Sequence, residues 1–304
     1  MQESLYIDGG DYQLHLRHIT KSSMGVPILM IHGSIENGLI FYTEKGKGLA
    51  CYLAEQGYDV YVADLRGRGK SSPSIDANAH FGQFELITQD IPLMIDFIRN
   101  KTNQAMHLVA HSWGGVLVAS CLARYPNYLS KILSNTCFGS KRVITVKSIE
   151  KFFKMNLVWG YAAVKLAKKQ GFLDAKKYRI GSDNETQQSL QQSIAWVSPS
   201  DWVDPHDGFD YQQAATKITW PPTWHLTGIN DKVLGHAQDV QRFIVESANS
   251  QAKFTLLAKQ NGNALDYDHI NILTHPKAID DHFPRLVQWL KATEQQTLKK
   301  TKQF

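Results

Sequence analysis

The stretch LVAHSWGGVLVAS, residues 108–120, places a serine between an apolar run and a pair of glycines. The apolar residues before Ser112 predict a buried strand, and Gly114–Arg124 predicts a helix. A serine on a sharp strand-to-helix turn has a strained backbone, so the residues two before and two after it must be small. Ala110 and Gly114 are small, although the usual motif has glycine at both positions. Ser112 is therefore a candidate nucleophile, and the alternative is a structural turn.

Short apolar runs alternate with helical patterns along much of the chain. The expected strands are Tyr12–Ile19, Val26–Ile31, Tyr58–Ala63, Met106–Ala110, Lys131–Thr136, Pro222–Leu226 and Lys253–Ala258. The expected helices are Glu44–Gln56, a segment around Ile87–Ile98 with Asp90 and Pro92 near its start, Gly114–Arg124, and Pro276–Ala292 followed by a frayed polar tail. This rhythm predicts βαβ units and a mostly parallel sheet, which is an α/β fold.

The alternation breaks between residues 138 and 217. That segment is basic and aromatic, and no strand pattern persists in it. We therefore expect an α/β core formed by residues 1–137 and 218–304, with residues 138–217 inserted as a mainly helical cap. The aromatic side chains form the cap's own small core, or they line a pocket that suits an apolar group. For the second role Trp159 and Trp196 are the candidates.

Positive charge is concentrated in the same segment. Residues 141–179 contain eleven Lys or Arg but only Glu150 and Asp174 as acids, within a chain of net charge +5. Such a run is usually a solvated face. It could instead attract anionic substrates or give weak peripheral contact with a membrane or another anionic surface.

Composition restricts the class of protein further. The 304 residues are 43% hydrophobic and 20% charged, as in an ordinary globular enzyme. The start of the chain has no secretory pattern, and no apolar run approaches the roughly 20 residues that span a bilayer. We therefore expect a soluble, cytoplasmic protein.

The three cysteines show neither a disulfide framework nor metal spacing. The GKS at 69–71 lacks the glycine of a phosphate loop, since Asp64 occupies that position, and we expect no nucleic-acid partner.

A serine hydroxyl becomes a nucleophile when a histidine takes its proton and an acid orients that histidine. Asp231, in TGIND, lies in the loop after an expected strand, and His269, in DHI, follows the next strand and a long loop. Both residues therefore belong at strand ends, like Ser112. Asp231 could alternatively stabilise a turn. Asp266 or Asp268 could cap the segment that follows, and the competing histidines are His275 and His282.

Hydrolysis of an acyl bond develops negative charge on the carbonyl oxygen, which backbone N–H groups can stabilise. The residue after the nucleophile, Trp113, is one expected donor. The other is Ser34, in the turn IHGS that follows the strand Val26–Ile31. The alternative is that His32 and Gly33 simply end that strand. The neighbouring Asp64 and Arg66 are expected to form structural hydrogen bonds beneath this region.

Taken together, IHGS, GYDVYVADLRGRGKS, AHSWGG, TGIND and DHI resemble the α/β-hydrolase superfamily. The stretch QDIPLMIDFI is similar to its acid lipase and esterase branch. The stretch CYLAEQGYDVYVAD also resembles polyhydroxyalkanoate synthases, which use cysteine where this chain has Ser112. The resemblance implies a twisted eight-stranded sheet, no metal or organic cofactor, and hydrolysis of a small-molecule carboxylic ester. Thioester or amide hydrolysis with the same three residues is the alternative, and so is a catalytically silent binding protein.

Overall fold

The computed structural model describes residues 1–21, 25–147 and 162–301. Its main feature is an eight-stranded sheet in the order β1-β2-β4-β3-β5-β6-β9-β10. The strands are β1 (Gln2–Asp8), β2 (Gln13–Ile19), β3 (Pro27–Ile31), β4 (Asp59–Asp64), β5 (Met106–His111), β6 (Ile132–Phe138), β9 (Thr223–Gly228) and β10 (Lys253–Leu257). Strand β2 pairs antiparallel with β1 and β4, and the other pairings are parallel. The eight-stranded, mostly parallel sheet confirms the predicted fold.

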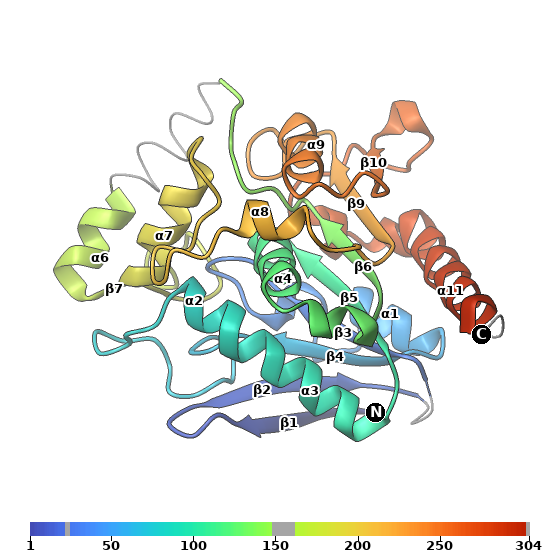
Figure 1. Ribbon diagram of the computed structural model, residues 1–304, viewed down its shortest axis with the longest axis horizontal. Coiled ribbons are helices and arrows are strands. Elements are labelled where there is room, and N and C mark those ends of the chain that lie inside the picture. Colours follow the sequence, from blue (N-terminus) through green and yellow to red (C-terminus); the bar gives the residue numbers. More distant parts are fainter. Residues whose placement is uncertain (22–24, 148–161, 302–304) are drawn as a thin grey trace.

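Helices cover both faces of this sheet (Figure 1). They are α1 (Leu49–Glu55), α2 (Gln83–Glu85), α3 (Ile91–Thr102), α4 (Trp113–Arg124), α6 (Val164–Gln170), α7 (Gln187–Val197), α8 (Tyr211–Ala215), α9 (Ala237–Glu246), α10 (Asn271–Thr274) and α11 (His282–Thr301). Short 3-10 turns span Gly38–Ile40, Pro126–Lys131, Lys259–Asn261 and Pro276–Asp280.

Strand β3 shows why the sheet needs cover on both sides. Its five residues are all buried. Leu29 and Ile31 belong to the apolar cluster beneath α3 and α4, whereas Ile28 and Met30 belong to the cluster beneath α1 and α11. Successive side chains of a strand point to opposite faces, so a continuous apolar run fills two cores at once.

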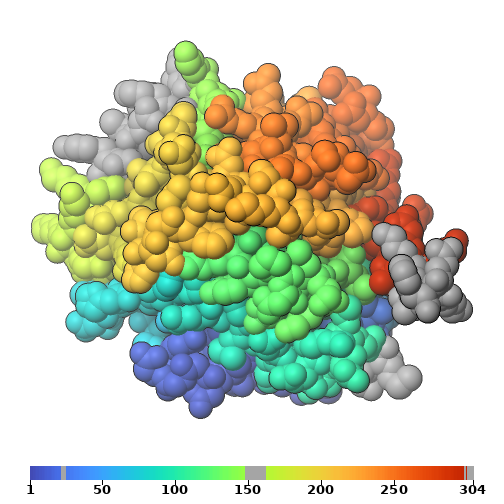
Figure 2. Space-filling model, in the orientation of Figure 1, coloured from blue at the N-terminus to red at the C-terminus, as the bar shows by residue number. Residues whose placement is uncertain are grey.

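The segment between β6 and β9 packs partly onto the main body. It contains α6, α7, α8 and a two-stranded sheet of β7 (Phe172–Leu173) and β8 (Glu185–Thr186). These two strands have only two residues each, which is too short to give a periodic pattern in the sequence. Trp196, Trp202 and Tyr211 join the apolar cluster that contains α3 and α4. In the space-filling view the yellow and orange surface of this segment is continuous with the green surface around α4 (Figure 2).

Two helix boundaries differ from the expected ones. Helix α1 begins at Leu49 rather than at residue 44, because Gly48 has a φ of +103° that no helix contains. The last helix is divided at Asp281, whose carboxylate accepts hydrogen bonds from Asn263, Ala264 and Tyr267. Beyond that point α11 continues to Thr301 instead of fraying after residue 292, since Glu, Gln and Lys are good helix formers.

The helix expected around Ile87–Ile98 is also more complex than predicted. It comprises α2, a π-helical turn at Leu86–Asp90, and α3. Asp90 makes no side-chain capping bond there. Its buried carboxylate instead accepts from the backbone N–H and the guanidinium of Arg66.

Candidate active site

Ser112 lies on the turn between β5 and α4. Its backbone adopts φ +51° and ψ −124°, a conformation that side chains other than glycine rarely take. The Ser112 N–H donates to the carbonyl oxygen of Phe138 at 2.8 Å, which ties the turn to the end of β6. A Cβ atom at Gly114 would lie 2.5 Å from the carbonyl oxygen of His32, so only glycine permits this approach. The turn thus presents the serine hydroxyl at the carboxyl edge of the sheet.

Ser112, His269 and Asp231 form a continuous hydrogen-bond chain. The Oγ atom of Ser112 lies 2.9 Å from Nε2 of His269, and Nδ1 of His269 lies 2.5 Å from Oδ2 of Asp231. Asp231 follows β9, and His269 lies between β10 and α10. Both are almost fully buried. The structure thus brings together the three residues that the sequence singled out on separate strand ends.

Asp231 is held in its ionised form. Burial alone would raise the pKa of its carboxyl group, but the charge and hydrogen bond of His269, the N–H of Gly235 and the charge of Lys141 together lower that pKa. An ionised carboxylate accepts the Nδ1–H of the imidazole and leaves Nε2 free to accept a proton from a hydroxyl.

Gly139 lets the end of β6 pack against this pair. Its φ is +59°, and a Cβ atom there would lie 2.9 Å from Nδ1 of His269 and 3.4 Å from Oδ2 of Asp231. The Gly139 N–H donates to the carbonyl oxygen of Leu226 at 2.8 Å. A side chain at this position would therefore displace either the histidine or the strand end.

The competing histidines, and the two acids expected to cap a segment, have other partners. The ring of His275 accepts from the backbone N–H of Lys277, and Nε2 of His282 donates to the carbonyl oxygen of Ile272. Asp266 accepts from the N–H of Lys259, and Asp268 accepts from two N–H groups just after it. Among the described residues, the Ser112 hydroxyl is hydrogen-bonded to His269 and to none of these four side chains.

Ser34 and Trp113 lie beside Ser112 on the wall of one cavity. Trp113 is the first residue of α4, so its N–H has no acceptor within the helix. Ser34 lies in the turn after β3, in which the Gly33 N–H donates to Glu36 at 2.9 Å and Ile35 adopts a φ of +50°. Within the described ranges, neither the Ser34 nor the Trp113 N–H donates to a protein acceptor. Both amides are thus available to a ligand.

His111 and Glu36 form a hydrogen-bonded pair next to His269 that the sequence analysis did not identify. His111 is fully buried; its Nδ1 lies 2.9 Å from Oε2 of Glu36, and its Nε2 donates to the backbone carbonyl of His269 at 2.9 Å. Burial opposes both charges, but each partner outweighs it: the pKa of Glu36 falls to about 2, and the pKa of His111 is raised. The signal was present in the sequence, because a histidine that ends a buried strand needs a polar partner.

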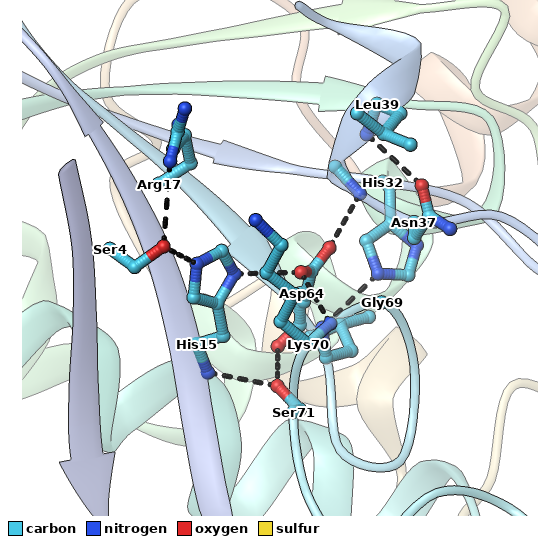
Figure 3. Close-up of polar contacts among 12 residues, drawn as sticks. Ser4, His15, Arg17, His32, Asn37, Leu39, Asp64, Gly69, Lys70 and Ser71 are labelled. Atoms are coloured by element: carbon cyan, nitrogen blue, oxygen red, sulfur yellow. Dashed lines mark hydrogen bonds and ion pairs between the residues drawn. The ribbon is translucent and has the colours of Figure 1, made fainter. Parts of the chain in front are cut away.

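His32 and Asp64 support the turn that carries Ser34. Nδ1 of His32 donates to the carbonyl oxygen of Gly33 at 2.8 Å, and Nε2 accepts from the N–H of Leu65 at 3.1 Å, so the ring is neutral. Asp64 accepts from the N–H groups of Gly38 and Lys70 and contacts Nδ1 of His15 (Figure 3). The predicted structural hydrogen bonds of Asp64 are confirmed, as are those of Arg66 with Asp90.

A cavity of about 700 Å³ opens beside Ser112. Its wall is largely apolar and is formed by Ser34, Ile35, Glu36, Leu39, Ile40, Ser112, Trp113, Lys141, Ile180, Gly181, Ser182, Ser193, Val197, Leu234, His269, Ile270 and Thr274. Residues from the segment between β6 and β9, such as Ile180 and Val197, therefore line the same cavity as residues from the rest of the chain.

The two tryptophans predicted to bind substrate have different outcomes. Trp159 lies outside the described residues. Trp196 is not part of the cavity wall: its Nε1 donates to the carbonyl oxygen of Val203 at 3.0 Å, and its ring packs on Trp113 and Tyr211. The large aromatic surface of Trp196 is used to join α7 to the main core, which explains why its position on the cavity was mispredicted.

The basic segment is also less uniform than expected. Lys141 is buried and lines the cavity, and the buried Arg142 pairs with Glu246.

No group of three or more His, Cys, Asp or Glu that could hold a metal occurs in the described part of the chain. None of the helices in those ranges is long and apolar enough to cross a membrane.

A family model described as "Serine aminopeptidase, S33" (Hydrolase_4) matches residues 25–260, which is more than half of the chain. The chain belongs to this α/β-hydrolase family. The match includes Ser112 and Asp231 and ends before His269.

The relatives that this chain resembles include lipases and a lysophospholipase. A protein named Probable lysophospholipase L2 from Haemophilus influenzae is 32% identical over 139 residues, covering 44% of this chain and 43% of the relative. Gastric triacylglycerol lipase of Mus musculus is 31% identical over 131 residues, covering 40% of this chain and 33% of the relative. The chain thus spans less than half the length of these relatives.

Solved structures share the fold over almost the whole chain. A soluble variant of monoglyceride lipase from Saccharomyces cerevisiae superposes with a TM-score of 0.70 at 15% identity, covering 96% of each chain. A structure described as a "putative lipase (lip1)" from Acinetobacter baumannii AYE gives a TM-score of 0.64 at 17% identity, covering 97% of this chain and 93% of the other. At these identities the likeness concerns the fold.

Proposed function

We propose that this protein hydrolyses carboxylic esters with an apolar acyl group, through an acyl-enzyme intermediate on Ser112. The hydrogen-bond chain from Asp231 through His269 to Ser112, at the wall of an apolar cavity, carries this proposal. An imidazole oriented by a carboxylate is the arrangement that activates a serine hydroxyl.

In the first half of the reaction, the Ser112 oxygen attacks the ester carbonyl carbon while Nε2 of His269 takes the hydroxyl proton. The carbonyl oxygen becomes an anion, and the N–H groups of Ser34 and Trp113 donate to it. When the tetrahedral intermediate collapses, the bond to the alcohol oxygen breaks and His269 returns the proton to that oxygen. Asp231 orients the imidazole and stabilises its protonated form throughout.

The second half repeats these steps with water. His269 takes a proton from the water molecule as its oxygen attacks the acyl carbon. Collapse of the second intermediate breaks the bond to the Ser112 oxygen, which receives the proton from His269. The carboxylic acid leaves, and the free serine is restored. His269 thus takes and returns the proton in both halves of the reaction.

We propose the segment 138–217 as a cap that selects the acyl group. Ile180, Ser193 and Val197 from this segment line the cavity together with Leu39 and Ile270 from the core.

Leu39, Ile180 and Ile270 are also partly exposed, which gives the cavity an apolar rim. This rim supports contact with esters held in micelles or at a membrane surface. The role of the positive charge in residues 141–179 is tested by hydrolysis of such esters at increasing salt. A rate that does not change with salt would mean that this charge does not attract the substrate.

Amide hydrolysis is the second candidate, because the description of the matching family names an aminopeptidase. A site for a peptide's amino terminus needs a carboxylate that can pair with it. The carboxylate on the described cavity wall belongs to Glu36, and it is already paired with His111. This pairing favours an ester as the substrate.

The test is hydrolysis of 4-nitrophenyl esters of increasing acyl length, compared with 4-nitroanilides of the same acids. The proposal predicts turnover of the esters with a maximum at intermediate chain length, and much slower turnover of the anilides. Faster hydrolysis of the anilides would favour the amidase, and absence of turnover with every substrate would favour a catalytically silent binding protein.

A further inference from the structure

We infer that Lys141 forms a subsite for an anionic group of the substrate, a phosphate or a carboxylate. This inference rests on the proposed ester hydrolysis, but anion binding at Lys141 can be measured without any ester turnover. Lys141 lines the same cavity as Ser112 and His269. If it binds an anion there, the favoured substrates are esters that carry a negative charge as well as an apolar chain.

The backbone holds Lys141 in a fixed place beside the site. It follows β6 closely, and the strand end is hydrogen-bonded on both sides: Phe138 accepts from the N–H of Ser112, and the Gly139 N–H donates to Leu226, both at 2.8 Å. Nζ of Lys141 lies 5.7 Å from the ring centre of Trp113, the residue after the serine. The ammonium group thus lies near a side chain that lines the same cavity as Ser112.

Lys141 has no polar partner among the described residues, although it is only 6% exposed. The carboxylates that act on it from a distance are Asp231 and Asp239, and neither forms an ion pair with it. Asp231 is bonded to His269, and one oxygen of Asp239 accepts from the backbone and side chain of Thr145. Burial lowers the pKa of Lys141 to about 8, so its charged form still predominates at neutral pH.

The neighbouring residue shows what a structural buried cation looks like in this protein. Arg142 pairs with Glu246 and donates to the backbone carbonyls of Trp196 and Ser200. A buried charge without partners is costly to fold, whereas one with this many partners is not. The difference between the two side chains indicates that Lys141 is kept for a ligand.

The charge of the cavity wall supports the same conclusion. Among the described lining residues, Glu36 carries the negative charge and is neutralised by His111. Lys141 therefore gives the described wall one positive charge that no carboxylate of the wall pairs with, among mostly apolar side chains. A ligand that matches this wall has an apolar chain and one anionic group.

Binding is measured by calorimetry in the Ser112→Ala background, with octyl phosphate, octanoate and 1-octanol as probes. Adding Lys141→Met is expected to weaken the binding of octyl phosphate or octanoate by about ten- to a hundredfold relative to the binding of 1-octanol. This is the effect of losing a charge-assisted hydrogen bond. The phosphate and carboxylate arms show which anion the site prefers. Lys141→Arg should keep most of the difference. Equal weakening of all three probes, or anions that bind no tighter than 1-octanol, would overturn the inference.

Stability separates a ligand-binding role from a structural one. Lys141→Met removes an unpaired buried charge, so its melting temperature should equal or exceed that of the original protein. A clear fall would mean that Lys141 supports the fold and would count against the subsite. The control is Lys101→Met on α3, an exposed lysine whose loss removes the same net charge and should leave the ratio of probe affinities unchanged.

Hydrolysis gives the second readout. The pair mono-4-nitrophenyl glutarate and 4-nitrophenyl pentanoate differs by a carboxylate on the acyl side, and 1-octanoylglycerol 3-phosphate and 1-octanoylglycerol differ by a phosphate on the alcohol side. In Lys141→Met the ratio of kcat/KM, anionic over neutral, should fall about tenfold for at least one pair. Unchanged ratios with active enzyme would overturn the inference alone. Lys141-dependent binding of octyl phosphate without any ester turnover would overturn the proposed function and leave the subsite standing.

Discussion

His111 donates a hydrogen bond from Nε2 to the backbone carbonyl oxygen of His269 at 2.9 Å. The residue just before the serine therefore holds the backbone of the histidine that hydrogen-bonds to that serine. The other ring nitrogen meets Glu36, which also accepts from the N–H of Gly33 in the turn that carries Ser34. One partly buried charge pair thus links the nucleophile turn, the histidine loop and the proposed oxyanion donors.

Glu36→Gln should destabilise the protein by about 1–3 kcal/mol, because it leaves a buried imidazolium without its counter-charge. Glu36, with its pKa lowered from 4.5 to about 2, stabilises the fold fully above pH 4.5 and loses this effect as the pH falls. His111, with its pKa raised from 6.5, stabilises fully below pH 6.5 and loses this effect as the pH rises through the raised value.

The free-energy gap between Glu36→Gln and the original protein should therefore be largest near pH 5.5 and smaller both at pH 3.5 and at pH 8.5. Urea unfolding at about these three pH values measures the gap. A gap of equal size at all three would show that the pair is not charged in the folded protein.

Gly139→Ala tests the close approach of β6 to the histidine. Gly139 and Gly262 both have positive φ values, but only the Cβ at residue 139 would clash with His269, whereas nothing lies within 4 Å of a Cβ at residue 262. Both variants should lose about 1 kcal/mol of stability from backbone strain. Gly139→Ala should in addition lose at least about 100-fold in kcat, since a misplacement of about 1 Å has that effect. Equal activity of the two variants would refute this role of Gly139.

Asp231→Asn should lower kcat for 4-nitrophenyl esters by about 10⁴-fold, and Ser112→Ala by about 10⁶-fold. The amide keeps the volume of the carboxylate but cannot stabilise the protonated imidazole or enforce its orientation. Steady-state kinetics, with folding checked by circular dichroism, gives both values. Near-full activity of Asp231→Asn would direct the search for the acid to another carboxylate.

Val197→Trp tests the cap. Val197 lines the cavity from α7, so a larger side chain there should shorten the preferred acyl chain while acetate esters are affected least. Val245→Trp on α9 is the matched control, because Val245 is 79% exposed and does not line the cavity. An unchanged chain-length profile in Val197→Trp would mean that the segment 138–217 does not select the acyl group.

The sheet and the hydrogen-bonded trio could be predicted because their signals are local. Continuous apolar runs such as Val26–Ile31 mark buried parallel strands, and small residues around Ser112 mark a tight turn. The contacts of Glu36 and His111 could not be predicted, because they join residues 75 apart in the chain whose approach depends on the folded sheet. The same reason explains Trp196 and Lys141: composition indicated an aromatic, basic segment, but packing decided which side chains face the cavity.

The central claim is that Ser112 is a nucleophile activated by His269. Its most direct test is labelling by a fluorophosphonate, which forms a covalent bond only with an activated serine. The account predicts rapid labelling of the original protein at Ser112, identified by peptide mass spectrometry. Labelling should be absent in Ser112→Ala and slowed by several orders of magnitude in His269→Ala, with both variants folded. Labelling that persists in Ser112→Ala, or that proceeds at the original rate in His269→Ala, would contradict the account.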